Sequence, residues 1–372
     1  MRKIINLILI FTIIMINLQF FVAKRTAFAS PKELTSAEGM VTIEQGSGRV
    51  LYEKDKDKRL PMASTTKILT AIVAIENAKD LDEKQEIPRE AVGIEGSSIY
   101  LRTGEHLTIR ELLYGLMLRS GNDSAVAIAI LVAGSVDEFV KLMNDFCEKL
   151  NLENTHIVTV NGLHSENHYS SASDLARITS YALKNETFAE IVGTRETKIS
   201  NEFDNKNKCR FLKNKNKLLK TLNGATGVKT GYTTKAGRCF VGSATRGGMT
   251  VICVVLNCRP MFEETKYLLE KAFDEYKLIK LFKKGELTSF YPDDKKVQKV
   301  SINIKNDIIY PLNAKEIKQI NAKIKSENNY YKDAVLEFRL QNNLIFSEKL
   351  YTILIYNKSD VKDNIHKIIK AF

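Results

Sequence analysis

The hydrophobic pattern that follows the N-terminal segment begins with two short runs typical of β-strands. Val41–Ile43 and Val50–Tyr52 are separated by Gln45-Gly46-Ser47-Gly48, which predicts two strands around a turn. The next stretch has apolar residues at helical spacing and predicts a helix from Ser64 to about Ala78. The pattern therefore changes from strand to helix between these segments.

Three pairs of residues mark further helix starts in the middle of the chain. In each pair, a serine or threonine precedes an acidic residue by three positions, which is the spacing of a capping box. The pairs are Thr108 with Glu111, Ser135 with Glu138, and Ser171 with Asp174. The first of these helices is predicted to run through Leu118. Ala125–Val132 is almost wholly apolar, which predicts a central buried helix.

Strand periodicity returns after Lys229. Cys239–Ala244 and Thr250–Leu256 are apolar runs around Arg246-Gly247-Gly248, which predicts a hairpin. The segment from Phe262 to Leu281 then has the pattern of a long amphipathic helix. Strands at both ends and helices between them indicate an α+β fold, with a sheet covered by helices and a helical cluster inserted between its strands.

After about Lys284, apolar and polar residues alternate as they do in half-buried strands. The alternating apolar positions are Val300, Ile302, Ile304, Leu336, Phe338 and Leu340. The second of these runs turns at Asn342-Asn343 and continues into Leu350–Tyr356. We therefore predict a first domain over residues 30–284 and a small β-rich second domain over residues 285–356.

Residues 357–372 form a short amphipathic tail. Ser359 and Asp360 can cap a helix that runs through Phe372. Its apolar stripe consists of Val361, Ile365, Ile368, Ile369 and Phe372. The lysines that lie mostly off this stripe are Lys362, Lys367 and Lys370. Such a helix either lies on a membrane surface or packs on the β-rich domain, since a helix this short needs a surface to fold against.

The first 29 residues indicate export. Arg2 and Lys3 precede an apolar run from Ile4 to Ala23, and the small-residue pattern Ala27-Phe28-Ala29 follows. This order predicts a secretory signal peptide cleaved after Ala29. The alternative is an uncleaved N-terminal anchor, because the run is nearly long enough to span a bilayer. In both cases the rest of the chain works outside the cytoplasm, at the outer face of the membrane or in the cell wall.

Charge and cysteine content narrow the function classes. Residues 1–29 contain four basic and no acidic residues, so their removal lowers the formal net charge from +12 to +8. This net positive charge suits binding to anionic wall polymers or lipid headgroups, whereas export argues against a nucleic-acid partner.

The chain has five cysteines without C-x-x-C spacing, so at least one is unpaired and no disulfide framework is predicted. His164-Ser165-Glu166-Asn167-His168 is not a zinc motif, and we predict a surface loop there.

Three short motifs carry candidate chemistry. In Ser64-Thr65-Thr66-Lys67, the serine and the lysine lie three positions apart on one helix face, so a neutral Lys67 amine can accept the proton of the Ser64 hydroxyl. The alternative is a helix-capping serine followed by a solvated lysine. In Ser120-Gly121-Asn122, the serine can relay a proton and the asparagine can bind a substrate amide. In Lys229-Thr230-Gly231, the lysine and threonine can hold a carboxylate, and the glycine leaves room for a substrate backbone.

In this order the three motifs resemble those of penicillin-binding proteins and class A β-lactamases. The residues that flank the motifs make the resemblance more specific. Pro61 to Thr70, Leu116 to Asp123 and Gly227 to Thr233 resemble the low-molecular-mass D-alanyl-D-alanine carboxypeptidases, over about residues 35–275. The resemblance implies the sheet and helices of the penicillin-binding transpeptidase fold for residues 30–284. It also implies that the β-rich remainder is an accessory domain, and relatives often end in a membrane-surface anchor of the kind that the tail could form.

The resemblance also implies a role for each motif residue. Ser64 would be the acylated nucleophile, Lys67 its general base, and Ser120 the residue that passes the proton onward. Asn122 would orient the peptide, and Lys229 and Thr230, with Gly231 beside them, would bind the terminal carboxylate. The backbone N–H groups of Ser64 and Tyr232 would form the oxyanion hole. Lys215 stands where relatives often have arginine, and it would help to bind carboxylate as a point charge. Nine basic residues and no acidic one lie between Asn205 and Lys235, and their field would attract an anionic peptide terminus.

The predicted function is a serine-type carboxypeptidase that removes the terminal D-alanine from peptidoglycan stem peptides, without metal or cofactor. β-Lactam antibiotics would be its covalent inhibitors. Three alternatives stay open on the sequence: an endopeptidase that cuts wall crosslinks, a β-lactamase, and a non-catalytic wall-binding protein on the same fold. Ser120-Gly121-Asn122 differs from the Ser-Asp-Asn motif of class A β-lactamases, which disfavours the second alternative.

Overall fold

The computed structural model describes residues 35–204, 206–285, 287–290, 297–304, 306–325, 335–340, 342–349, 352–357 and 368–370. The predicted signal peptide and most of the predicted tail lie outside these residues. In the described ranges, no helix is long and apolar enough to cross a membrane.

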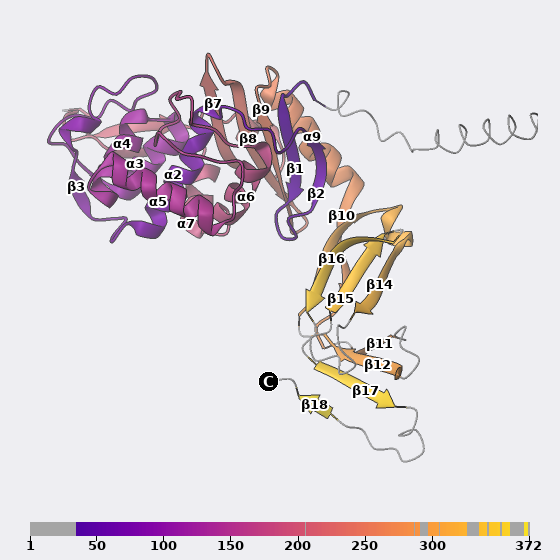
Figure 1. The fold of residues 1–372 in the computed structure, drawn as a ribbon. Coiled ribbons are helices and arrows are strands. Elements are labelled where there is room, and N and C mark those ends of the chain that lie inside the picture. The colour runs from indigo at the N-terminus through magenta and orange to yellow at the C-terminus, as the bar shows by residue number, and fades with distance from the viewer. Residues whose placement is uncertain are drawn as a thin grey trace, which may run out of the picture.

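A five-stranded antiparallel sheet forms the centre of the larger part of the molecule (Figure 1). Its strand order is β2-β1-β9-β8-β7. The strands are β1 (Gly39–Glu44), β2 (Val50–Lys54), β7 (Ala225–Thr233), β8 (Gly237–Arg246) and β9 (Met249–Leu256). The pairs β1–β2 and β8–β9 confirm the two predicted turns. The last strand in the order is β7, so one of its edges faces away from the sheet.

Apolar residues bury both faces of this sheet. On β8, Cys239 and Val241 face a core cluster shared with the helical part of the chain, whereas Phe240 faces a second cluster. Alternate residues of a strand point to opposite faces, so a run that is apolar throughout fills two cores at once. The second cluster includes Leu268 and Ala272 of α9 (Met261–Glu275), which covers that face.

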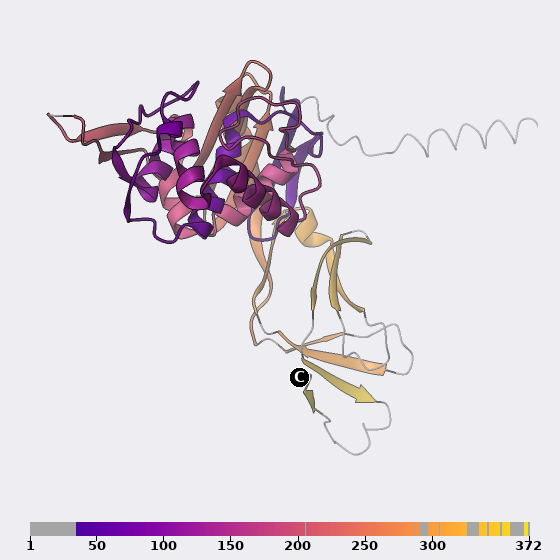
Figure 2. The ribbon, with the colours of Figure 1, turned by 60° about the vertical axis from the view of Figure 1, so that its left-hand side comes forward.

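The helical cluster lies on the other face of the sheet and is inserted in the chain between β2 and β7, as predicted (Figure 2). Its helices are η2 (Ala63–Thr66), α2 (Lys67–Asn77), η3 (Arg89–Ala91), α3 (Ile109–Tyr114), the π-helical turn η4 (Gly115–Arg119), α4 (Asn122–Ala133), α5 (Val136–Lys149), α6 (Ala172–Ala182), α7 (Glu186–Gly193) and α8 (Leu218–Thr221). Two small hairpins belong to the same part: β3 (Lys84–Glu86) with β4 (His106–Thr108), and β5 (Glu196–Ser200) with β6 (Cys209–Lys213).

The predicted helix caps are present. Thr108 and Glu111 form a full capping box, in which each side chain accepts the backbone N–H of the other residue. The hydroxyls of Ser135 and Ser171 accept the backbone N–H groups of Glu138 and Asp174. All five cysteines are free thiols, so the fold is held without disulfides, as expected.

The predicted helix from Phe262 to Leu281 is wrong in its last part. The helix α9 ends at Glu275, and β10 (Tyr276–Phe282) follows it and pairs with β13 (Ile308–Asn313). The segment Tyr276–Phe282 has apolar residues at a spacing that suits a helix or a strand, and the pairing partner lies about thirty residues further along the chain. Tertiary pairing therefore decides its structure.

The C-terminal part is rich in strands, as predicted. It contains β11 (Leu287–Phe290), β12 (Val297–Asn303), β14 (Ile320–Lys325), β15 (Val335–Leu340), β16 (Asn343–Lys349), β17 (Thr352–Asn357) and the short helix η5 (Glu316–Lys318). The turn at Asn342 leads into β16, which pairs back onto β15, whereas β17 joins a different sheet. The boundaries 285 and 356 stay a prediction, although β10 already pairs with this part from residue 276.

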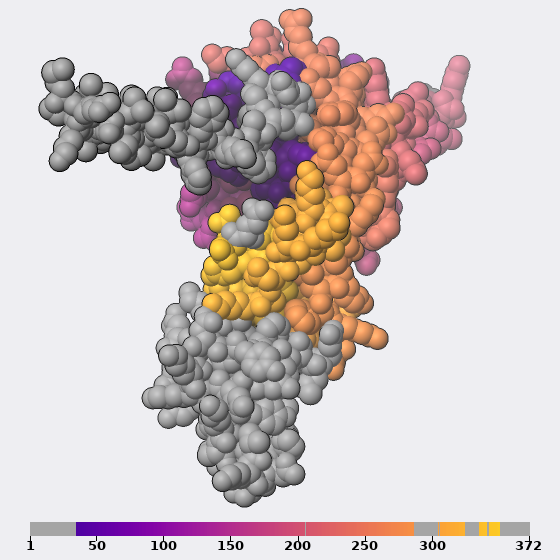
Figure 3. All heavy atoms as spheres, turned by 90° about the vertical axis from the view of Figure 1, so that its right-hand side faces the viewer, coloured from indigo at the N-terminus to yellow at the C-terminus, as the bar shows by residue number. Residues whose placement is uncertain are grey.

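Two features show contact between the strand-rich C-terminal part and the rest of the chain. In the space-filling view its yellow and orange atoms lie directly against the part that holds the central sheet (Figure 3). At that contact, Arg49 forms an ion pair with Glu316 at 2.5 Å, and its guanidinium lies 5.2 Å from the ring centroids of both Tyr276 and Tyr310.

The predicted C-terminal helix is wrong where the structure describes the tail. Ile368–Lys370 form a strand, β18, which pairs with Thr352–Leu354 of β17. The remaining residues of the predicted helix lie outside the described residues. The β18 pairing satisfies backbone groups that the helix would have satisfied internally.

Candidate active site

The three motifs converge where β7 of the sheet lies against η2 of the helical cluster. Lys67 Nζ lies 3.0 Å from Ser64 Oγ and 2.7 Å from Asn122 Oδ1. A side chain added at Gly231 would place its Cβ 3.1 Å from the backbone nitrogen of Ser64. The S-x-x-K segment therefore contacts both the S-x-N and the K-T-G segments, although the three are far apart in the sequence.

Ser64 lies in a tight turn rather than in the first turn of an α-helix. It belongs to η2, and the α-helix begins only at Lys67. The preceding residue, Ala63, has a positive φ of 48°, which an L-residue rarely adopts. Gly162 packs so closely that a Cβ there would lie 2.1 Å from the Ala63 carbonyl oxygen. Strained backbone of this kind is typical of functional sites.

Lys67 is fully buried, and its ammonium form is disfavoured. Besides Ser64 and Asn122, its Nζ contacts the carbonyl oxygen of Asn161 at 2.5 Å. Burial lowers the pKa of Lys67 well below its usual value, and the charges of Lys229 and Lys215 lower it further, while Asp123 opposes the shift. A lysine in this setting can be neutral and can accept the proton of the serine hydroxyl.

The S-x-N segment forms the turn between η4 and α4. Ser120 is buried there with a left-handed backbone, at φ 65°. The Asn122 side chain is fixed at both ends, because Oδ1 accepts from Lys67 and Nδ2 donates to the Glu95 carbonyl at 2.6 Å. In this structure Asn122 therefore positions Lys67, and one of the two Nδ2 hydrogens is used by the Glu95 carbonyl.

Lys229 and Lys215 complete a cluster of positive charge. Lys229 is fully buried on β7 and donates to the carbonyl oxygen of Thr230 at 2.8 Å. Burial, with the charge of Lys215, lowers the pKa of Lys229 to about 7. Lys215 is exposed overall and donates to Ser97 Oγ at 3.0 Å, and desolvation of its amine, followed by the charge of Arg119, lowers its pKa. The cluster favours an anion, since a bound carboxylate would relieve the repulsion among the lysines.

The strand β7 presents its outer edge to this cluster. Thr230 is partly exposed, and Tyr232 is 64% exposed. Gly231 lies between them against the backbone of Ser64 and Thr65. An extended peptide can add to such an edge through main-chain hydrogen bonds. The structure therefore brings Ser64, Lys67, Asn122 and Gly231 together, and Lys229 and Lys215 are near enough for their charges to act on Lys67.

His168 is a site residue that the sequence analysis placed wrongly in a surface loop. His164 is exposed, but His168 is buried beneath the nucleophile turn. Its Nδ1 accepts the Val158 N–H at 3.0 Å, so Nε2 carries the proton and donates to Thr66 Oγ1 at 2.8 Å. The Thr66 hydroxyl donates in turn to the Ala63 carbonyl at 2.8 Å.

This chain of hydrogen bonds holds the strained backbone of Ala63, the residue before Ser64. Burial, and then the neighbouring histidines and Lys67, lower the pKa of His168 to about 4, so the imidazole is neutral at pH 7. In the described part of the chain, no group of three or more His, Cys, Asp or Glu side chains could hold a metal ion.

Comparison with known proteins identifies close relatives. Residues 25–259 match the family model described as D-alanyl-D-alanine carboxypeptidase. D-alanyl-D-alanine carboxypeptidase DacF of Bacillus subtilis (strain 168) is 35% identical over 293 residues, which are 77% of this chain and 75% of that protein. The solved structure of penicillin binding protein 5 from Haemophilus influenzae is 26% identical, with a TM-score of 0.72 over 87% of this chain and 97% of that chain. The DD-transpeptidase of Streptomyces K15 is 36% identical, with a TM-score of 0.61 over 64% of this chain and 98% of that chain.

Proposed function

This chain belongs to the D-alanyl-D-alanine carboxypeptidase family, and we propose that it removes the terminal D-alanine from peptidoglycan stem peptides through an acyl-enzyme on Ser64. The observation that carries the proposal is the contact of 3.0 Å between Ser64 Oγ and the buried Lys67 amine. Its surroundings favour the neutral amine, which is what a serine nucleophile needs from its base.

In the acylation step, the Ser64 hydroxyl gives its proton to the Lys67 amine, and Oγ attacks the carbonyl carbon of the penultimate D-alanine. The backbone N–H groups of Ser64 and Tyr232 stabilise the resulting oxyanion, since β7 lies directly against η2 at Gly231. The peptide C–N bond then breaks. The leaving D-alanine amine takes up the proton that Lys67 accepted, with Ser120 in the proposed relay.

In the second step, water hydrolyses the ester on Ser64 and releases the shortened peptide. The lysine cluster supports a C-terminal specificity. The buried Lys229, with Thr230 beside it and Lys215 near enough to lower its pKa, makes a site for the free carboxylate of the terminal D-alanine. A β-lactam acylates the same serine, in agreement with the penicillin-binding relative.

The test is the release of free D-alanine when the purified chain 30–372 is incubated with a stem peptide that ends in D-alanyl-D-alanine. Free D-alanine supports the carboxypeptidase. Cleavage of crosslinked dimers to monomers, without D-alanine release, would instead establish an endopeptidase. The absence of both products would leave a non-catalytic wall-binding protein, and a Ser64→Ala variant is the matched negative control.

We further propose that the chain acts outside the cytoplasm, after removal of residues 1–29. Support comes from the basic start, the apolar run and Ala27-Phe28-Ala29 in the sequence. N-terminal sequencing of the exported protein is expected to begin at Ser30. A start at Met1 in the membrane fraction would establish an uncleaved anchor instead.

Membrane-surface association of the tail is the last part of the proposal. It rests on the apolar and basic residues of 357–372, and β18 offers packing on the β-rich part as the competing role. The mature chain is expected to sediment with anionic vesicles at low salt, and truncation after Lys358 is expected to release it. Failure of the mature chain to sediment would leave packing as the role of the tail.

A further inference from the structure

The Thr66 hydroxyl lies in the middle of a buried chain of hydrogen bonds beneath the nucleophile turn. It donates to the Ala63 carbonyl oxygen at 2.8 Å and lies 2.8 Å from His168 Nε2. A hydroxyl has a single proton, so donation to Ala63 makes His168 the donor in the second contact. The Val158 N–H, which donates to Nδ1 at 3.0 Å, requires the same tautomer of the ring. Thr66, His168 and Ala63 are all buried, so bulk water does not compete for these contacts.

The Ala63 carbonyl belongs to the same peptide group as the Ser64 N–H. A peptide group is planar, and in its trans form the C=O and the N–H point in opposite directions. The direction of the Ala63 carbonyl therefore sets the direction of the Ser64 N–H. Gly162 also packs against this carbonyl, since a Cβ at Gly162 would lie 2.1 Å from its oxygen. The peptide plane is thus confined by the Thr66 hydroxyl and by the backbone of Gly162.

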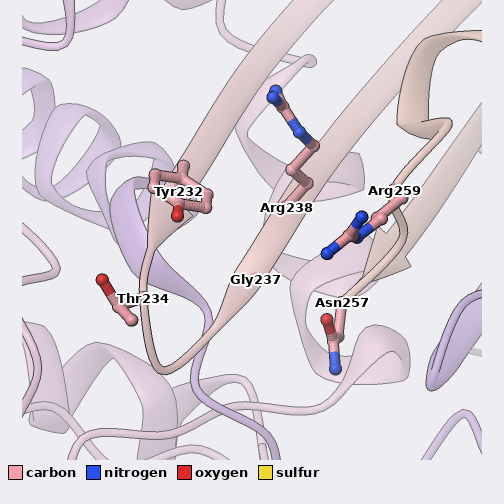
Figure 4. Close-up of a pocket in the computed structure, with 6 residues that line it drawn as sticks. All are labelled: Tyr232, Thr234, Gly237, Arg238, Asn257 and Arg259. Atoms are coloured by element: carbon pink, nitrogen blue, oxygen red, sulfur yellow. The ribbon is translucent and has the colours of Figure 1, made fainter.

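The two N–H groups of the proposed oxyanion hole are held in different ways. Figure 4 shows Tyr232 on β7, close to the turn that leads to β8, and the pairing of Tyr232 with Arg238 fixes its backbone within the sheet. Ser64 instead lies in the four-residue helix η2 and follows Ala63, whose φ of 48° an L-residue rarely adopts. Such a backbone persists only where its surroundings hold it in place.

We propose that Thr66 and His168 are positioning residues that aim the Ser64 N–H at the oxyanion of the acylation step. The His168 ring orients the Thr66 hydroxyl, the hydroxyl holds the Ala63 carbonyl, and the carbonyl sets the plane of the peptide group that carries the donor. An oxyanion hole works through N–H groups that are in place before the charge develops. This inference rests on the proposed function and adds to it two residues that act on the reaction only through the backbone.

The first test measures the rate at which fluorescent penicillin acylates Thr66→Val, which keeps the shape of threonine without its hydroxyl. We expect acylation to slow by about tenfold to a hundredfold, because loss of a whole oxyanion-hole donor costs about 10²- to 10³-fold and here the donor is misdirected. With the D-alanyl-D-alanine peptide, kcat is expected to fall while KM changes little, since the oxyanion forms only along the reaction. Thr66→Ser keeps the hydroxyl and is expected to retain the wild-type values.

The second test is an infrared measurement that reports on the donor itself. A hydrogen bond to a carbonyl lowers its stretching frequency, so the ester carbonyl of the penicillin acyl-enzyme should absorb at a higher frequency in Thr66→Val than in the wild type. Penicillin with an isotope label at the β-lactam carbonyl identifies this band. His168→Leu removes the group that orients the Thr66 hydroxyl, and it is expected to change the rate and the band in the same direction. It therefore tests the inference even where Thr66→Val fails to fold.

The matched control is Thr70→Val. Thr70 is fully buried four positions further along the chain, and its hydroxyl donates to the Val160 carbonyl oxygen at 2.7 Å. This contact joins α2 to the same segment that contains Gly162, but it does not involve the peptide group between Ala63 and Ser64. Thr70→Val is therefore expected to keep the acylation rate and the carbonyl band of the wild type.

Two results would overturn the positioning role. One is an unchanged rate and an unchanged band in both Thr66→Val and His168→Leu, and the other is an equal change in Thr70→Val. If penicillin failed to label the wild type, the acyl-enzyme on Ser64 would itself be refuted, and with it the proposed function on which this inference rests.

Discussion

Acid should destabilise the nucleophile turn through His168. In the folded chain the pKa of His168 is lowered to about 4, whereas an unfolded histidine has a pKa of about 6.5. Between these values the unfolded state binds more protons than the folded state, so the free energy of unfolding falls as the pH is lowered. The contribution of neutral His168 to the free energy of unfolding is complete above about pH 6.5 and is lost as the pH falls to about 4. Linkage gives a loss of about 2 kcal/mol between pH 7 and pH 5.

Urea unfolding of the mature chain at pH 7 and pH 5, followed by circular dichroism, measures this loss. Carboxylates titrate over the same pH range and also change the stability. The contribution of His168 is therefore the difference between the wild type and His168→Gln in the free energy of unfolding lost from pH 7 to pH 5. The glutamine amide can still donate to Thr66 but does not titrate, and its pH-dependent loss should be smaller by about 2 kcal/mol. The matched control is His106→Gln at a side chain that is 47% exposed, and it should retain the loss of the wild type. An equal loss in His168→Gln and the wild type would refute the assignment of a buried neutral imidazole.

The remaining predictions concern the proposed chemistry. Fluorescent penicillin should label the chain covalently and fail to label Ser64→Ala, and labelling that survives this substitution would remove Ser64 as the nucleophile. Lys67→Ala should slow acylation about 10²- to 10⁴-fold, with an unchanged circular dichroism spectrum. In the wild type, acylation should slow as the pH falls, because protonated Lys67 cannot accept the serine proton; a flat rate down to acidic pH would contradict this. Thr230→Val should reduce kcat/KM more for peptides with a free C-terminal carboxylate than for their amides, and an equal reduction would make Thr230 a structural residue.

The reacting residues could be predicted from the sequence because their spacing is local. Ser64 and Lys67 are one turn apart, so a single helical segment fixes their approach. The groups that surround the Lys67 amine could not be predicted in the same way. The Asn161 carbonyl reaches Lys67 from 94 positions away, and no local pattern signals a backbone acceptor. His168 was missed because its neighbours are polar, and only the tertiary fold shows that its ring is buried under Thr66.

The errors in the fold have a related cause. The catalytic sheet was predicted correctly because continuous apolar runs such as Cys239–Ala244 fill both faces and have few alternatives. Tyr276–Phe282 and Ile368–Lys370 have patterns that suit a helix or a strand, and each pairs with a strand from a different segment. Propensity alone does not choose between two structures when a pairing partner supplies the backbone hydrogen bonds.

The lysine cluster has the electrostatic features that the proposed binding of a substrate carboxylate requires. Lys67 and Lys229 are both fully buried, and the charge of Lys215 contributes to lowering the pKa of each. Asp123 opposes the shift at Lys67, but its carboxylate is already held by the backbone N–H groups of Ile99 and Leu101. The free site therefore keeps a positive potential that no side chain fully neutralises. A substrate carboxylate would supply the missing charge and favour protonated Lys229, while Lys67, which faces Ser64, has to remain neutral for attack. In the proposed mechanism the two lysines would thus take opposite protonation states, because Lys229 would face the substrate carboxylate whereas Lys67 faces Ser64.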